Sequence, residues 1–172
     1  MAVPYLACMA LVAQIYALPP RVLPSIQAVE GGGPGVAQRN QDGSEDLGVM
    51  QINTLWLPTL SRYSKLPISI VREQLLQRSC YNIAAAGLIL RTYLDEAGGN
   101  LMQAVGNYHS HTPVHHQSYR VKVTQAAFVL FPPAPASAMA PSFMPVSAGA
   151  NRYPPSRGST NSALRPRRTV KE

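Results

Sequence analysis

The sequence predicts an α+β fold that is mostly α-helical, with one small β-element, followed by a disordered C-terminal tail. Three observations lead to this prediction. Several segments carry apolar residues at helical spacing, a hairpin turn signal (Asp42-Gly43) stands in a polar stretch, and the composition changes at Pro132. We therefore expect a folded domain over residues 1–131 and a tail over residues 132–172.

The tail is set apart by its composition and charge. It holds half of the 16 prolines, mixed with Ala, Ser, Gly and Arg, and too few large apolar residues to bury a core. Six of the fifteen Lys and Arg residues lie there with one of the eight acidic residues, so the domain is nearly neutral although the chain carries +7. Because basic residues are not interleaved with aromatic ones on a structured face, we expect no nucleic-acid partner.

The helices are expected in the following order. Residues 4–17 form the first helix, which ends at Leu18-Pro19-Pro20, and residues 20–30 form the second, since proline is tolerated in a first turn. Residues 34–46 are predicted to be a loop, with an irregular β-element at 42–52. Further helices are predicted over 54–63, 69–77, 80–96 (the clearest, stopped by Gly98-Gly99), 101–108 and 113–131.

The first helix has to be distinguished from a targeting segment. Val3 to Leu18 is apolar enough for the core of a signal peptide, but no Lys or Arg precedes it. It is too short, and too interrupted by Pro4 and Gln14, to span a bilayer. We interpret it as a structural helix that supports the second one, we expect no transmembrane segment, and the route of export stays open.

The second helix ends in a single carboxylate, Glu30, followed by Gly31, Gly32 and Gly33. Glycine ends helices readily, so the carboxylate is expected at a helix C-terminus that faces an open, glycine-lined space. The helix dipole disfavours an anion there, and burial by apolar neighbours would act in the same direction, so both raise the pKa of the carboxyl. A carboxylic acid that stays protonated near neutral pH can act as a general acid.

This stretch resembles the catalytic signature of lytic transglycosylases, the SLT domain of the lysozyme-like superfamily. The family reads E-S-x and then N-G-S-x-D-x-G-x-M-Q-I-N; here the matching segments are Ala28-Val29-Glu30-Gly31-Gly32 and Asn40 to Asn53. Ala104 to Ser110 is similar to the family segment A-x-x-x-Y-N-x-G, and the resemblance covers about Ala7 to Phe131. It implies a lysozyme-like domain that acts on peptidoglycan glycan strands.

The resemblance also implies which residues form the site. Glu30 would be catalytic, and Tyr108 would place its hydroxyl near the Glu30 carboxyl and orient it. The sequence departs from the family pattern at Gly31, where Ser is usual, and at His109-Ser110-His111, where Asn-x-Gly is expected. Trp56 is expected to pack in the core, with sugar stacking as the alternative. For Met50 a place in the core, and for Tyr108 a purely structural place in a helix, are the alternatives. The residues expected to bind substrate are Gly31, Gly48, Met50, Gln51, Asn53, Tyr108 and His109.

Two groups of residues have the side-chain types of metal ligands. Asn40, Asp42, Ser44 and Asp46 alternate like the ligands of a calcium loop, but Gly43 is misplaced for the turn and Gln51 stands where a bidentate Glu belongs. The four histidines (His109, His111, His115 and His116) have no Cys or acidic residue close in sequence. We expect no metal and no cofactor, and interpret the histidines as a solvated, sugar-lining cluster.

A single catalytic carboxylate favours an intramolecular reaction. Protonated Glu30 would donate to the glycosidic oxygen of the β-1,4 bond between N-acetylmuramic acid and N-acetylglucosamine, then deprotonate the C6 hydroxyl, which attacks C1 to give a 1,6-anhydro end. A lysozyme-type hydrolase in which Asp42 or Asp46 holds water is one alternative. A non-catalytic, wall-binding scaffold protein is the other.

The resemblance extends to the small transglycosylases that accompany conjugation and type IV or type III secretion systems. Those with an invasion- or secretion-associated role have one Cys in the first helix and one in a D-P-C-x-N-I segment, which implies a disulfide between Cys8 and Cys80 here and a periplasmic location. Buried free thiols are the alternative for two isolated cysteines. The basic tail would suit binding to the machinery or to anionic wall polymers, or would be a solvated linker.

Overall fold

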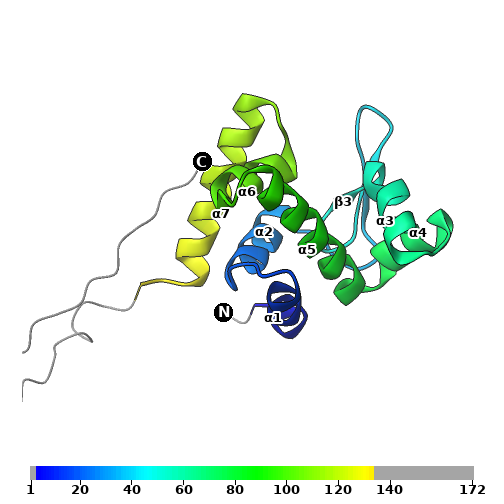
Figure 1. Cartoon of the computed structure of the whole chain (residues 1–172), viewed down its shortest axis with the longest axis horizontal. Helices are drawn as coiled ribbons and strands as arrows, with labels where there is room; N and C mark the ends of the chain where they lie inside the picture. The colour runs from blue at the N-terminus through cyan, green and yellow to red at the C-terminus, as the bar shows by residue number, and fades with distance from the viewer. Residues whose placement is uncertain (1–2, 134–172) are drawn as a thin grey trace, which may run out of the picture. The chain divides into compact units, whose positions relative to one another are not determined.

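The computed structural model describes residues 3–133, and these residues form a mostly helical domain with one small sheet (Figure 1). This confirms the predicted α+β fold class. In the described range the elements are seven α-helices, one short 3-10 helix and three strands. The predicted tail, 132–172, lies outside the described residues except for Pro132 and Pro133. None of the described helices is long and apolar enough to cross a membrane.

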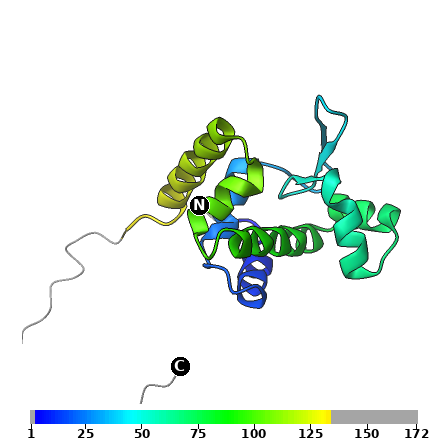
Figure 2. The same cartoon turned by 45° about the horizontal axis from the view of Figure 1, so that its top comes forward.

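Helix α5 (Ser79–Glu96) runs through the middle of the domain (Figures 1 and 2). Its apolar residues are buried on more than one side because neighbouring helices pack around it, and Gly98 and Gly99 follow its end with positive φ angles. Gly87 allows α1 to approach closely, since a Cβ there would lie 2.3 Å from Val12 Cγ1. The predicted helix at 80–96 is therefore confirmed within one residue.

Two of the other helices, over residues 6–15 and 101–109, pack closely on α5. Helix α1 (Leu6–Ile15) is two residues shorter at each end than the sequence predicted. Helix α2 (Val22–Glu30) begins two residues later than predicted and ends at Glu30 as predicted. Helices α6 (Leu101–His109) and α7 (Pro113–Leu130) match the predicted ranges within one residue. Helix α7 lies against both α2 and α6. This packing places the C-terminus of α2, and with it Glu30, beside α7.

The β-element is an antiparallel sheet of three short strands, β1 (Ala37–Arg39), β2 (Glu45–Leu47) and β3 (Ile52–Asn53), in the order β1-β2-β3. Arg39 pairs with Glu45, so the predicted Asp42-Gly43 turn joins β1 to β2. The prediction of a loop over 34–46 is wrong in part, because β1 lies inside it. Strand β1 has three exposed residues and therefore no apolar alternation that could reveal it.

The remaining elements follow β3. A 3-10 turn, η1 (Thr54–Trp56), leads into α3 (Leu57–Ser64), and α4 (Ile68–Gln77) precedes α5. The buried Asn82 of α5 connects this region: its Nδ2 donates to the carbonyl oxygens of Leu47 (2.7 Å) and Leu75 (2.9 Å), and its Oδ1 accepts from the Met50 amide (2.8 Å). One side chain thus joins the β-element to α4 and α5.

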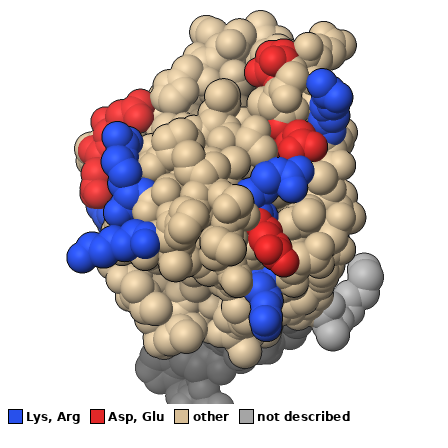
Figure 3. All heavy atoms as spheres, turned by 90° about the vertical axis from the view of Figure 1, so that its right-hand side faces the viewer, with Lys and Arg blue, Asp and Glu red and all other residues tan. Residues whose placement is uncertain are grey.

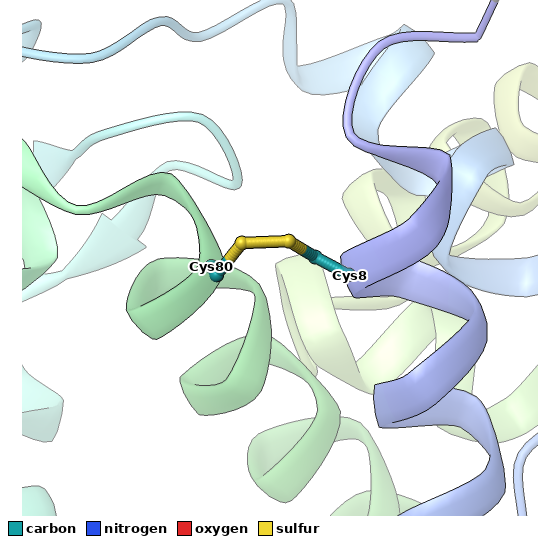
Figure 4. Close-up of a disulfide and its surroundings, with 2 residues drawn as sticks. All are labelled: Cys8 and Cys80. Carbon is teal, nitrogen blue, oxygen red and sulfur yellow. A yellow bond between two sulfur atoms is a disulfide. The ribbon is translucent and has the colours of Figure 1, made fainter.

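A disulfide joins α1 to the start of α5 (Figure 4). It links Cys8 and Cys80, which are 72 residues apart in sequence and have Cα atoms 5.5 Å apart. This is the bridge that the family resemblance implied. It also places α1 within the folded domain, as the structural interpretation of residues 4–17 predicted.

The charged residues of the domain are mixed on the face that carries the β-element, α3 and α4. Figure 3 shows Lys and Arg side chains interspersed with Asp and Glu there rather than gathered in one patch. Arg72 and Glu45, for example, form an ion pair of 2.6 Å between α4 and β2. This distribution agrees with the near-neutral charge of the domain, and the absence of a nucleic-acid partner stays a prediction.

Candidate active site

A cleft of about 400 Å³ lies between the β-element and the helices. One side is formed by the ends of α2 and α6 and by α5, and the other by β2, β3 and η1. Most of the side chains that line the cleft are polar, which suits a ligand rich in hydroxyl groups. Its lining includes Glu30, Asn40, Asp46, Gln51, Asn53, Trp56, Tyr93, Asn107, Tyr108, His109, Ser110 and His111.

Glu30 is the last residue of α2 and points into this cleft. The helix ends there because Gly31 adopts a left-handed conformation (φ +63°), and its amide donates to the Gln27 carbonyl at 2.9 Å. A side chain at Gly31 would meet no atom within 4 Å, so this position is open, as predicted. Gly31 is exposed at the rim and is not among the residues that line the cleft.

The Glu30 carboxyl accepts a short hydrogen bond from the hydroxyl of Tyr119 on α7. The prediction assigned this role to Tyr108, and the structure corrects it: the Tyr108 hydroxyl donates to the Met50 carbonyl oxygen at 3.1 Å. Tyr108 lines the cleft, but its hydroxyl is held by the segment between β2 and β3. Tyr119 is only 4% exposed, and a buried phenol requires a hydrogen-bond acceptor, which Glu30 supplies.

Burial raises the pKa of the Glu30 carboxyl from 4.5 to about 7. The negative charge of Asp46 also raises this pKa, whereas the hydrogen bond from Tyr119 and the positive charge of Lys122 lower it. Burial also raises the pKa of Tyr119, so its hydroxyl stays protonated and remains a donor. Glu30 can therefore exchange a proton near neutral pH, which a general acid and base requires.

Asp46 faces the same cleft from β2, but its surroundings are polar. Its two oxygens accept from the side-chain amides of Asn53 (2.9 Å) and Asn40 (3.1 Å). Asp42 lies in the hairpin turn, where Ser44 donates to it from both its backbone amide (2.9 Å) and its hydroxyl (2.6 Å) and thereby lowers the pKa of this carboxyl. The alternating polar residues thus hydrogen-bond to one another and close the hairpin.

Gln51 and Asn53 line the cleft with most of their polar atoms already engaged. Gln51 adopts a positive φ (49°) and its Nε2 donates to the Gly48 carbonyl at 2.8 Å, which leaves its amide oxygen unengaged among the described contacts. Asn53 donates to Asp46 and accepts from the Leu55 amide at 2.9 Å, which caps η1. Gly32 must lack a side chain here, since a Cβ would lie 2.1 Å from the Gly48 carbonyl oxygen.

Besides Gly31, two of the predicted substrate-binding residues, Met50 and Gly48, do not line the cleft. Met50 is completely buried, and its backbone rather than its side chain contacts the site, because its carbonyl oxygen accepts from Tyr108. Gly48 is buried as well, and a Cβ there would lie 2.3 Å from the Leu75 carbonyl oxygen. Both residues let the β-element pack closely on α4 and α5, and their part in substrate binding stays a prediction.

Two histidines, His109 and His111, lie at the cleft from the end of α6. The His109 ring stacks on the Tyr119 ring, with centroids 4.6 Å apart and planes 4° from parallel. His111 Nε2 lies 3.0 Å from Glu96 Oε1, so this histidine has an acidic partner that sequence distance concealed. Within residues 3–133 no three His, Cys, Asp or Glu side chains are grouped as a metal site would require.

An aromatic wall lies at the cleft beside His111. Tyr93 contacts Trp56 edge to face at 5.7 Å and His111 at 5.5 Å between ring centroids. Trp56 is half-buried and packs against the core, as predicted, but it also lines the cleft. Trp56 and Tyr93 together form this aromatic wall, which gives the cleft flat apolar surfaces beside its polar groups.

Sequence comparisons identify related proteins. A family model described as Transglycosylase SLT domain matches residues 7–125. The chain is 35% identical over 79 residues to a protein named Invasion protein IagB from Salmonella typhimurium (strain SL1344), and equally identical to its counterpart from Salmonella typhi. Each match covers 46% of this chain and 46% of the relative, so the chain spans about half the length of the curated relatives it matches.

Proposed function

The chain belongs to the transglycosylase SLT domain family, and from this premise we propose that it is a peptidoglycan lytic transglycosylase. The observation that carries the proposal is the place and state of Glu30: its carboxyl ends α2 at the cleft, accepts from the Tyr119 hydroxyl, and has its pKa raised to about 7 by burial. A half-protonated acid at neutral pH can first give and then take a proton in one catalytic cycle.

In the proposed mechanism Glu30 first donates its proton to the oxygen of the glycosidic bond as that bond breaks. Positive charge then develops at C1 of the N-acetylmuramic acid residue. The Glu30 carboxylate, held by the Tyr119 hydroxyl, removes the proton from the C6 hydroxyl of the same sugar. The C6 oxygen then bonds to C1. One product ends in N-acetylglucosamine with a free hydroxyl, the other ends in 1,6-anhydro-N-acetylmuramic acid, and Glu30 is protonated again.

No second catalytic carboxylate is needed for this reaction. The attacking hydroxyl belongs to the substrate, so its high effective concentration replaces activation of a water molecule. The Tyr119 hydroxyl contributes by stabilising the carboxylate form of Glu30 after the first proton transfer. Gln51 and the aromatic wall are proposed to hold the glycan strand in the cleft.

A second candidate is a hydrolase of the lysozyme type, and Asp46 is the observation that favours it. This carboxylate lines the same cleft as Glu30, with its oxygens bound by two amides. Asp42 is less suited to this role because Ser44 holds it within the hairpin turn. A hydrolase would produce reducing ends in place of anhydro ends.

Fragments released from purified sacculi test the proposal. Wild type, Glu30→Gln and the matched control Glu73→Gln, an exposed glutamate of α4, are compared by mass spectrometry. We expect anhydro-muropeptides from wild type and from the control but none from Glu30→Gln. Reducing ends lost in Glu30→Gln would establish the hydrolase, and no release by wild type would leave a wall-binding scaffold.

We further propose that the protein works in the periplasm and opens the wall locally for a secretion or conjugation apparatus. The Cys8–Cys80 disulfide supports an oxidising compartment. The 35% identity to a protein named for invasion supports a link to such an apparatus. The basic residues of 132–172 are proposed to bind the apparatus or anionic wall polymers. Pull-down of envelope proteins with the full chain and with residues 1–131 tests this role.

A further inference from the structure

His109 occupies the position where the family pattern has Asn, and its ring is stacked on the phenol that holds the proton donor. The ring centroids of His109 and Tyr119 are 4.6 Å apart and the planes are 4° from parallel. His109 comes from α6 and Tyr119 from α7, so the stack joins two helices at the cleft. The Tyr119 hydroxyl donates to Glu30, which comes from a third helix, α2.

The two rings differ in their exposure. Tyr119 is 4% exposed, whereas His109 is exposed and lines the cleft. The imidazole therefore covers a face of the phenol on the side of the cleft. Without it, that face would meet solvent and the phenol ring could rotate or tilt, so its hydroxyl would no longer be fixed on the Glu30 carboxyl.

We propose that His109 is a positioning residue: its ring fixes the Tyr119 ring, so that the Tyr119 hydroxyl stays on Glu30 through both proton transfers. The inference rests on the proposed function. It differs from the prediction that His109 contacts substrate, because here the flat imidazole ring contacts Tyr119 and holds it in place. Its ring nitrogens are not needed for this role.

The charged groups around the stack favour an uncharged imidazole. Partial burial of its ring lowers the pKa of His109, the positive charges of His115 and Lys122 on α7 act in the same direction, and Asp46 on β2 opposes them. A neutral ring next to Tyr119 does not add a positive charge beside Glu30, which would favour loss of the acid proton.

Steady-state kinetics on soluble, uncross-linked glycan strands test the proposal, first with three single variants. We expect His109→Ala to lower kcat by about three- to tenfold with KM changed less than about twofold. His109→Phe keeps a flat ring without nitrogens and is expected to restore kcat to within about twofold of wild type. Gln125→Ala, at an exposed residue of α7 outside the cleft lining, is the control and should behave like wild type.

Comparison of Tyr119→Phe with the double variant Tyr119→Phe/His109→Ala shows whether the loss of kcat in His109→Ala depends on the Tyr119 hydroxyl. In the Tyr119→Phe background we expect His109→Ala to have no further effect on kcat. If the two effects multiply, or if KM rises while kcat is unchanged, His109 acts directly on the substrate and the proposal is overturned. Failure of His109→Phe to restore kcat would overturn it as well.

An NMR titration of the Glu30 carboxyl separates this inference from the proposed function, since it needs no turnover. Loss of the Tyr119 hydrogen bond raises the pKa of Glu30 because that bond stabilises the carboxylate. We expect Tyr119→Phe and His109→Ala to move this pKa upward and His109→Phe to leave it in place. An unchanged or lowered pKa in His109→Ala overturns the inference, whereas a wild type without turnover overturns only the proposed function.

Discussion

The hydroxyl of Tyr119 donates a hydrogen bond to the carboxyl of Glu30 across 89 residues of sequence. The bond joins the C-terminus of α2 to the middle of α7, where Tyr119 is buried and Glu30 is partly buried at the cleft. Burial keeps Glu30 protonated near neutral pH, while the hydroxyl stabilises the carboxylate once the proton has left. The pair therefore serves both halves of a reaction in which one group is first an acid and then a base.

Removing the Tyr119 hydroxyl should slow turnover and move its pH dependence. We expect Tyr119→Phe to reduce kcat by about ten- to hundredfold, since a hydrogen bond to a charged group contributes about 1.5–3 kcal/mol. The alkaline limb of kcat/KM should move to higher pH, because the bond lowers the pKa of Glu30. Tyr81→Phe, on α5 outside the cleft lining, is the control, and an unshifted limb in Tyr119→Phe would contradict the assignment.

Glu30 should make the fold less stable as the pH rises. Its pKa is raised from 4.5 to about 7 in the folded state, so the folded protein binds the proton more tightly than the unfolded chain. Its contribution is fully present below the unfolded pKa and is lost as the pH rises through the folded pKa, by about 1–3 kcal/mol after allowance for its partial exposure.

The variant Glu30→Gln removes this titration. We expect it to be more stable than wild type at pH values above about 7 and to lose this advantage below about 4.5. Urea unfolding across this range measures the difference, with Glu73→Gln as the exposed control. Equal stability of wild type and Glu30→Gln at high pH would mean that the folded state does not penalise the charged carboxylate.

The buried side chain of Asn82 should be essential to the β-element. Replacement by Ala leaves the Met50 amide and the carbonyls of Leu47 and Leu75 without their partner, and we expect a loss of about 3 kcal/mol. Thermal unfolding checks this, with the exposed Gln14→Ala as control. A folded variant with unchanged stability would contradict the connecting role of Asn82.

The Cys8–Cys80 bridge should contribute strongly to stability. It closes a loop with a sequence separation of 72, and cross-links of this length stabilise by about 4 kcal/mol in the chain-entropy model. We expect reduction of wild type, and the double variant Cys8→Ala/Cys80→Ala, to lower Tm by similar amounts. If the reductant lowers the Tm of the double variant as much as that of wild type, the effect of the reductant on wild type does not come from breaking the bridge.

The sequence predicted Glu30 because its signal is local: a carboxylate ends an apolar helix at a run of glycines. Tyr119 was missed because its partner is far away in sequence and because α7 has apolar residues on several faces, so no stripe marks its buried side. A lone tyrosine in the middle of a predicted helix was a possible signal, since a buried phenol must find an acceptor. The Glu96–His111 contact was missed because these two residues are also far apart in sequence.

The β-element was only partly predictable. The turn at Asp42-Gly43 follows from local chemistry, but β1 is an exposed strand whose pairing with β2 depends on backbone hydrogen bonds that no side-chain pattern reveals. Met50 could be core or groove from sequence, and only the packing of the β-element on α5 decides for the core. Helix α5 was predicted within one residue because its many apolar residues at helical spacing and the stop at Gly98-Gly99 are both visible in the sequence.

The source of the oxygen at the new glycan ends tests the central claim, that the attacking group is the substrate's own C6 hydroxyl. Digestion of sacculi in water labelled with heavy oxygen, followed by mass spectrometry, gives this directly. We predict 1,6-anhydro ends that are lighter than reducing ends by one water and carry no label. Reducing ends that carry the label would contradict the account, because they require water as the nucleophile and assign Asp46 a catalytic role beside Glu30.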